Sequence, residues 1–233
     1  MQSNYIITIK KSNRKSISIQ CQQTNNQNEL LIKAPLFVSK KVIEQFIHEK
    51  SNWITKQFNH YDNNKHLTFP TTFKAGTTLY FLGKPYQLEH HIHSQKKIFF
   101  NQNTLILTCP NNTSEPEKKQ IVIKWYKQLA KDILIDRTLY YANLLNQTVN
   151  KIVIKQQKSR WGSCSTKKNI NLNWLLIKTP LEIINYVTLH ECCHLIHMNH
   201  SKDFWNLVQQ HMPNYKDHQQ WLQKFGSSIL ANH

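Results

Sequence analysis

Apolar and polar residues alternate along much of the first 110 positions, which predicts a series of short β-strands. We expect strands at residues 5–10, 15–21 and 29–34, with the first two forming a hairpin around residues 11–14. Two further strand pairs are expected, 77–82 with 86–93 and 98–100 with 104–109. One helix interrupts them, because apolar residues recur with a 3.6-residue period from Val42 to Ile54 after Ser39, a good N-cap.

The polar, turn-forming segment 110–114 predicts a boundary between two domains. Residues 114–117 have the pattern of a capping box and open a long helix, whose apolar stripe is Val122, Trp125, Leu129 and Ile133. Strands are then expected at 152–155 and 169–176, paired antiparallel across a turn at 165–168. The predicted class is α+β, with a β-rich accessory domain carrying one helix at 1–112 and a second domain at 113–233.

A third helix is expected after Thr179 and Pro180, and it extends to about Met198. It contains the pattern H-E-x-x-H at residues 190–194. His190 and His194 are one turn apart, so both imidazoles project from one face and suit a single Zn²⁺ ion. Glu191 lies about 100° around the helix, where it reaches a metal-bound water without being a ligand. The nearly all-apolar flanks of this helix predict that it is buried.

A catalytic zinc site needs a third protein ligand. No glutamate follows Glu191, so the candidates are His197, His200, Asp203, His211, Asp217 and His218. His197 would lie about 10.5 Å along the helix axis from His190, too far to share an ion with it. His200 is favoured, because Asn199 can end the helix and let the chain turn back. The spacing of His190 and His200 is also that of the metzincin zinc motif.

Two other groups of residues leave alternatives open. Arg160, Trp161 and Gly162 form a turn that either positions substrate or an anionic group, or is purely structural. His91 and His93 share a strand face, but no other ligand pattern accompanies them. The five cysteines do not suggest a disulfide framework, and Cys192 and Cys193 are expected in the core, pointing away from the two histidines.

The charge of this 233-residue chain is strongly basic, with a formal net charge of +17. A strongly basic chain is suited to binding nucleic acid or other polyanions. Only three of the 30 basic residues are arginines, however, which favours a compositional bias toward lysine over a selected nucleic-acid surface. No run of 18 apolar residues and no signal-peptide pattern occurs. We therefore expect a cytoplasmic protein with no membrane contact.

The motif-bearing segments resemble the YgjP-like metallopeptidase family, which is related to the SprT-like and WLM zinc peptidases. They are residues 159–164, 169–174, 185–187, 190–195, 197–201, 204–205 and 212–213. The resemblance implies a zincin-type catalytic domain that binds one zinc ion per chain through His190, His194 and His200. It implies Glu191 as the catalytic base, and Cys192 and Cys193 stand where small or aliphatic residues are usual.

The main functional hypothesis is a zinc-dependent peptidase that hydrolyses peptide or protein substrates with a metal-activated water and Glu191 as general base. Arg160, Tyr186 and His197 are candidate substrate or oxyanion contacts. One alternative is a pyrophosphohydrolase of nucleoside triphosphates such as UTP, although the sequence has no P-loop. The other is a DNA-associated protease that acts on bound proteins.

Overall fold

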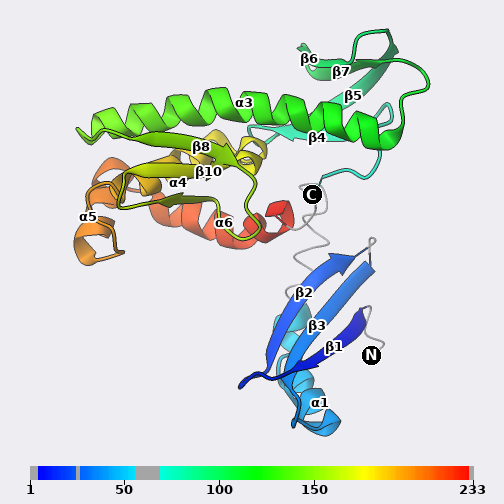
Figure 1. The fold of residues 1–233 in the computed structure, drawn as a ribbon, viewed down its shortest axis with the longest axis vertical. Coiled ribbons are helices and arrows are strands. Elements are labelled where there is room, and N and C mark those ends of the chain that lie inside the picture. The colour runs from blue at the N-terminus through cyan, green and yellow to red at the C-terminus, as the bar shows by residue number, and fades with distance from the viewer. Residues whose placement is uncertain (1–4, 25–26, 56–68, 231–233) are drawn as a thin grey trace. The chain divides into compact units, whose positions relative to one another are not determined.

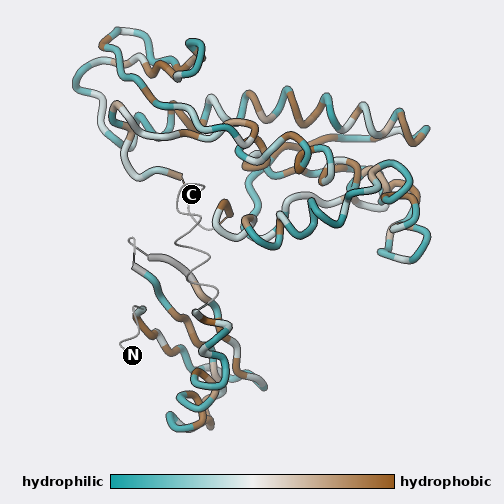
Figure 2. Tube along the Cα trace, turned by 180° about the vertical axis from the view of Figure 1, so that it is seen from behind, coloured by the Kyte–Doolittle hydropathy of each residue, from teal (hydrophilic) through white to brown (hydrophobic). Residues whose placement is uncertain are grey.

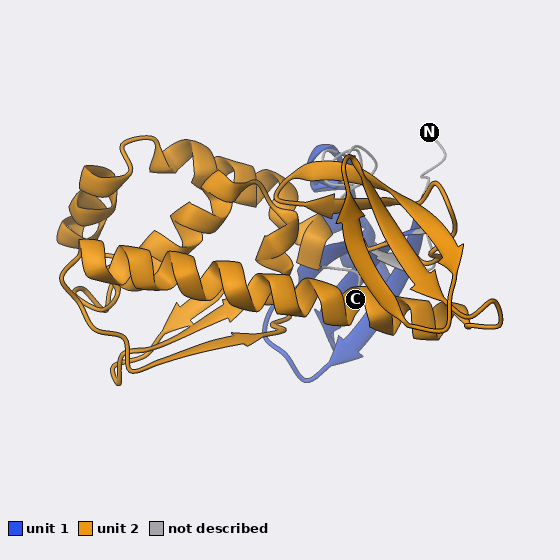
Figure 3. Ribbon diagram, turned by 90° about the horizontal axis from the view of Figure 1, so that it is seen from above, with its two compact units in different colours: residues 1–66 blue, residues 67–233 orange. Residues whose placement is uncertain are grey.

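The computed structural model describes residues 5–24, 27–55 and 69–230. The chain divides into two compact units, residues 1–66 and 67–233 (Figure 3). Each unit combines strands with helices (Figure 1), which confirms the predicted mixed α+β class. Within the described segments, no helix is both long and apolar enough to span a bilayer.

The first unit contains a three-stranded sheet in which the last strand is central. Its strands are β1 (Ile6–Ser12), β2 (Ser18–Thr24) and β3 (Gln27–Pro35), in the order β1-β3-β2. The predicted hairpin between the first two strands is wrong, because β3 lies between them, parallel to β1 and antiparallel to β2. The reason is burial, since the fully buried residues Leu30, Ile32 and Ala34 all belong to β3.

Helix α1 (Lys40–Glu49) begins where the sequence predicts. The Ser39 hydroxyl accepts a hydrogen bond from the Val42 amide at 3.4 Å, which confirms the N-cap. Ile43 and Ile54 are buried in one cluster with β3, whereas Val42 and Trp53 are exposed. The predicted periodicity runs to Ile54, but α1 ends at Glu49, and within it Val42 is exposed.

The second unit begins with a four-stranded sheet that matches the predicted strand pairs. It contains β4 (Thr78–Phe81), β5 (Lys84–Ile92), β6 (Lys97–Asn101) and β7 (Thr104–Cys109). The β4–β5 and β6–β7 pairs are antiparallel, as expected, and β5 runs parallel to β7. The order is β4-β5-β7-β6.

Helix α3 (Glu115–Leu144) opens with the predicted capping box, in which the Glu117 carboxylate accepts a hydrogen bond from the Ser114 amide at 3.0 Å. Its most buried stripe lies beside the predicted one. It consists of Val122, Tyr126, Ala130 and Leu134, whereas Trp125, Leu129 and Ile133 are only partly buried. Figure 2 shows apolar and polar residues in alternation along this helix.

The division at residue 66 differs from the predicted boundary after residue 112. The cause is a shared core, because Leu79, Leu88 and Leu105 of the four-stranded sheet pack in the same cluster as α3. The Tyr126 hydroxyl also donates a hydrogen bond to the Tyr80 carbonyl at 2.7 Å. The polar segment 110–114 is thus a connection inside the second unit.

A second sheet in this unit contains β8 (Lys151–Lys155), β9 (Gly162–Cys164) and β10 (Asn169–Asn173), in the order β8-β10-β9. The predicted antiparallel pairing of residues 152–155 with residues 169–176 is wrong, because β8 and β10 are parallel. The turn at 165–168 instead joins β9 to β10, which are antiparallel. The chain reverses direction between β8 and β9 and again between β9 and β10. β10 therefore runs in the same direction as β8.

The strand predicted to continue to residue 176 ends at Asn173. The buried Asn173 amide group donates hydrogen bonds to the carbonyls of Gln157 and Arg160, and its oxygen accepts one from the Leu175 amide. This caps a 3₁₀ helix, η2 (Trp174–Lys178), which is followed by α4 (Leu181–Cys193), α5 (Lys202–His211) and α6 (Tyr215–Leu230). Thr179 does not cap α4, since its hydroxyl donates to the Leu176 carbonyl at the end of η2.

Lys178 is buried, with its ammonium 5.5 Å from the centre of the Phe69 ring, and burial lowers its pKa to about 7. In the unfolded chain the pKa is about 10.4, so between these values the unfolded chain binds the extra proton. We expect Lys178→Met to raise the free energy of unfolding at pH 7. This gain should shrink by about 1.4 kcal/mol per pH unit up to pH 9. The reason is that the free-energy cost of deprotonating the wild-type lysine on folding falls as the pH rises.

Urea denaturation at pH 7, 8 and 9 measures this difference between variant and wild type. The exposed Lys216→Met change is the matched control and should give no pH-dependent gain. An equal pH dependence for both variants would contradict the assignment.

Candidate metal centre

Helix α4 carries the H-E-x-x-H pattern through the core of the second unit. Its residues Ile184, Val187 and Leu189 are buried in the hydrophobic core, as the sequence predicts. His190 lies in the last turn, and His194 is the C-cap residue. The two rings are therefore one turn apart, with their centres separated by 4.9 Å.

The chain turns back directly after His194, because α4 ends five residues earlier than its periodicity predicts. Tight turns close the helix end, with the amides of Leu195 and Ile196 bonding to the carbonyls of Cys192 and Cys193. Ser201 then starts α5, where its hydroxyl accepts a hydrogen bond from the Phe204 amide at 3.3 Å. This short connection brings His200 back beside the helix.

Three imidazoles converge at this point: His190, His194 and His200. Each offers a ring nitrogen, and the three nitrogens lie within 4.8 Å of one another. The Nε2 atoms of His190 and His200 are 3.0 Å apart. Within the described segments, this is the one group of three or more His, Cys, Asp or Glu side chains close enough to hold a metal ion.

Hydrogen bonding favours a metal-binding tautomer of His194. Its Nδ1 lies 2.9 Å from the His197 carbonyl, and a carbonyl only accepts, so Nδ1 carries the proton and the Nε2 lone pair is available. Metal-binding histidines in proteins commonly donate their other N–H in this way. The Nδ1 of His190 is buried and has no hydrogen-bond partner among the described residues.

The environment keeps the two helical histidines neutral. Burial, followed by the neighbouring His194 and His200, lowers the pKa of His190 to about 3. Burial also lowers the pKa of His194, although the hydrogen bond to His197 acts in the opposite direction. Neutral imidazole is the form that binds a metal, so neither ring has to lose a proton near pH 7.

Two aromatic residues of α5 fix the imidazoles from the other side. Phe204 is fully buried and stacks on His194, with ring centres 4.5 Å apart. Trp205 stacks on His200 at 5.5 Å and on Tyr215 at 5.3 Å. The sequence argument gave these residues no role in the site, because nothing in their spacing links them to the histidines.

Glu191 is only 6% exposed and lies against β9, where Gly162 faces it. A methyl group on Gly162 would lie 2.6 Å from the Glu191 Oε1 atom and 2.8 Å from its Cδ. Burial raises the pKa of the Glu191 carboxyl to about 8, while the charge of Arg160 acts to lower it. Gly162 is therefore needed for a close approach, whereas the sequence suggested only a turn.

A family model described as "YgjP-like, metallopeptidase domain" matches residues 15–225. The chain belongs to the YgjP-like metallopeptidase family. It is accordingly a metal-dependent protease, as the resemblance of its motifs implied.

Solved structures similar to this YgjP-like metallopeptidase include two metallopeptidase zymogens. Abylysin of Pyrococcus abyssi is 21% identical with a TM-score of 0.37, and the match covers 41% of this chain and 98% of that one. Jannalysin of Methanocaldococcus jannaschii is 28% identical with a TM-score of 0.33, and the match covers 41% of this chain and 95% of that one. No curated protein matches the chain in sequence.

The three candidate substrate contacts of this metallopeptidase lie at different depths. Tyr186 is buried, with its ring centre 6.0 Å from that of His190. Arg160 is exposed, yet its charge acts on the Glu191 carboxyl. His197 contributes its backbone carbonyl to the site, through the bond to His194.

The remaining metal-ligand candidates are not part of the three-histidine group. They are Asp203, His211, Asp217 and His218. The cysteines between Glu191 and His194 are fully buried, as expected, and the Cys192 thiol donates to the Thr138 carbonyl at 3.5 Å. The His91 Nε2 atom lies 3.4 Å from a Glu89 carboxylate oxygen, and both residues belong to β5 of the four-stranded sheet.

Gly162→Ala tests the contact with Glu191. We expect peptidase activity to fall about a hundredfold, because the added methyl group displaces the carboxylate by a few tenths of an ångström or more. Metal content should stay that of the wild type, since the three atoms nearest to the added methyl group all belong to Glu191 and none to a histidine. Ser163→Ala in the same strand, which adds no atoms, is the control, and an equal loss in both variants would contradict this explanation.

Proposed function

We propose that this chain hydrolyses peptide bonds with one zinc ion held by His190, His194 and His200. The convergence of three imidazole nitrogens within 4.8 Å carries the proposal. The donor set fits the metal, because three neutral histidines with a fourth position left open are a common set of catalytic zinc ligands. The hydrogen bond between His194 Nδ1 and the His197 carbonyl is consistent with a ring that binds through its Nε2 atom.

A bound zinc ion supplies Lewis acidity, which lowers the pKa of water and polarises a carbonyl oxygen. We assign the general base to Glu191, which follows His190, lies against Gly162 of β9 and is not a member of the three-histidine group. The positive charge of a bound zinc ion would lower the pKa of Glu191 from the value of about 8 that burial gives. Its carboxylate would then accept a proton from the attacking water and deliver it to the departing amine. The apolar surroundings of α4 keep bulk water away from this carboxylate.

We further propose that residues 113–233 carry the zincin-type catalytic elements of the second unit, and that β9 aligns the substrate. β9 is an edge strand, whereas β10 is central and has no free edge for another strand. An extended peptide can pair with such an edge through backbone hydrogen bonds. Gly162 lies in β9 against Glu191, so a peptide on this edge lies next to the general base.

Arg160 and Tyr186 are the residues we propose to contact the carbonyl oxygen of the substrate. Arg160 immediately precedes Trp161 and β9 and acts electrostatically on Glu191. Tyr186 packs against His190 from the preceding turn of α4. For His197 we propose a positioning role, because its carbonyl fixes the tautomer of His194.

The direct test compares protein and nucleotide substrates on the same preparation. We expect purified protein to cleave unfolded casein, to lose that activity on chelation and to regain it with added zinc. Release of pyrophosphate from UTP should be absent. Nucleotide hydrolysis that disappears in His190→Ala, with no proteolysis in the wild type, would overturn the proposal.

A further inference from the structure

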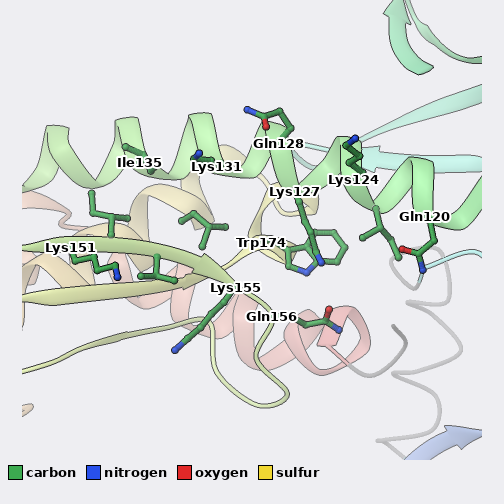
Figure 4. A pocket seen from close by; sticks show the side chains of 14 residues that line it. Gln120, Lys124, Lys127, Gln128, Lys131, Ile135, Lys151, Lys155, Gln156 and Trp174 are labelled. Carbon is green, nitrogen blue, oxygen red and sulfur yellow. The ribbon is translucent and has the colours of Figure 1, made fainter. Parts of the chain in front are cut away.

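A second feature of the unit formed by residues 67–233 lies away from the histidines, between α3 and β8. It is a groove of about 700 Å³, shown close up in Figure 4. β8 and β9 form opposite edges of the three-stranded sheet, so the groove and the Glu191 contact belong to different edges. The proposed peptidase mechanism uses none of its residues.

The walls of the groove carry a concentrated positive charge. Lys124, Lys127 and Lys131 come from one face of α3, and Lys151 and Lys155 come from β8. No Asp or Glu residue is among the groove residues, and none of these lysines forms an ion pair within the described segments. Asp132, next to Lys131, accepts hydrogen bonds from Gln128 instead. Five lysines on the two elements that line one groove favour an anionic occupant.

The groove meets β8 along its edge. Six consecutive residues, 151–156, line it. Successive side chains of a strand point to opposite faces, so a groove over one face would be lined by alternate residues only. β8 is also the terminal strand of its sheet, paired with β10 alone among the described residues. Its outer edge therefore has backbone groups available for another strand.

The interior of the groove is aliphatic and offers no surface for base stacking. Ile123, Ile152 and Ile154 are among the residues that line it. The one aromatic residue among the groove residues, Trp174, is only 1% exposed. Proteins that bind single-stranded nucleic acid combine basic grooves with accessible aromatic rings. A peptide of alternating acidic and apolar residues matches this groove better.

We propose that this groove binds an extended acidic segment of a partner protein by strand addition to β8. Backbone hydrogen bonds to the β8 edge hold the segment. Its apolar side chains contact the isoleucines, and its carboxylates contact the lysines. This binding does not depend on the proposed peptidase chemistry.

The test measures binding of a fluorescein-labelled peptide of alternating Glu and Val residues by fluorescence anisotropy. Full-length protein with Glu191→Gln is used, so that cleavage does not disturb the measurement. We expect the triple change Lys127→Gln, Lys131→Gln and Lys155→Gln to weaken binding about tenfold. The control triple change Lys167→Gln, Lys216→Gln and Lys224→Gln removes the same charge from exposed sites and should weaken binding less than twofold.

Two further probes distinguish strand addition from other modes of binding. The same peptide with N-methyl groups at alternate residues keeps its charge but cannot pair with a strand edge, so its binding should be lost. A single-stranded oligothymidylate should not compete for the groove. Equal effects of both triple changes, unchanged binding of the methylated peptide, or competition by the oligonucleotide would each overturn the proposal. Circular dichroism of both variants checks that the fold is retained.

Discussion

His200→Ala is expected to remove zinc and peptidase activity together. The proposed site has three protein ligands, and two of them are fixed by one helical turn, so the loop histidine completes it. Loss of one ligand should weaken zinc binding about a hundred- to a thousandfold, if the free energy of a protein zinc site is divided among its ligands. Plasma emission analysis of dialysed protein measures zinc content, and casein cleavage measures activity.

His197→Ala is the matched control for this change. His197 lies in the same connection between α4 and α5, but it contributes its backbone carbonyl, which the substitution keeps. This variant should retain about one zinc ion per chain. A full equivalent of zinc in His200→Ala would contradict the proposed ligand set.

The second large effect is expected for Glu191→Gln, which should retain zinc and lose turnover by a factor of about 10² to 10⁴. Glutamine has nearly the shape of glutamate and fits against Gly162, but it cannot accept the proton of the attacking water. The loss should appear in kcat at unchanged zinc content. Steady-state cleavage of a fluorogenic peptide, measured beside zinc analysis, separates the two quantities.

Glu182→Gln is the control within the same helix. Glu182 is exposed in the first turn of α4, far along the chain from the histidines. It should keep wild-type kcat. Wild-type proteolysis in Glu191→Gln would exclude the carboxylate as the general base, while leaving the metal site untouched.

Features that depend on neighbours in the sequence could be predicted well. Ser39 and Ser114 start helices as their positions suggest, because a cap bonds to groups only two or three residues away. The hairpins around Gly83 and residues 102–103 follow from short turns in the same way. The end of α4 was the exception, since the five residues 194–198 continue its pattern of apolar and histidine residues beyond Cys193.

Partners far apart in the sequence could not be predicted from the same patterns. Alternation identified β1, β2, β8 and β10 as strands, but it does not encode which strand lies beside which or in what direction. The central place of β3 and the parallel pairing of β8 with β10 follow from burial of the whole sheet. The domain boundary differed for the same reason, because α3 covers a sheet that precedes the polar segment.

For the site, the sequence alone determined the pair His190 and His194 as neighbours on one helical turn, with Glu191 around the same helix. It also favoured His200 through its spacing. Only the tertiary structure decided that Phe204 and Trp205 stack on the imidazoles, that Gly162 makes room for Glu191, and that lysines of α3 and β8 share a groove. Helical neighbours are fixed by a local period of 3.6 residues, whereas these contacts join elements whose packing depends on the whole core.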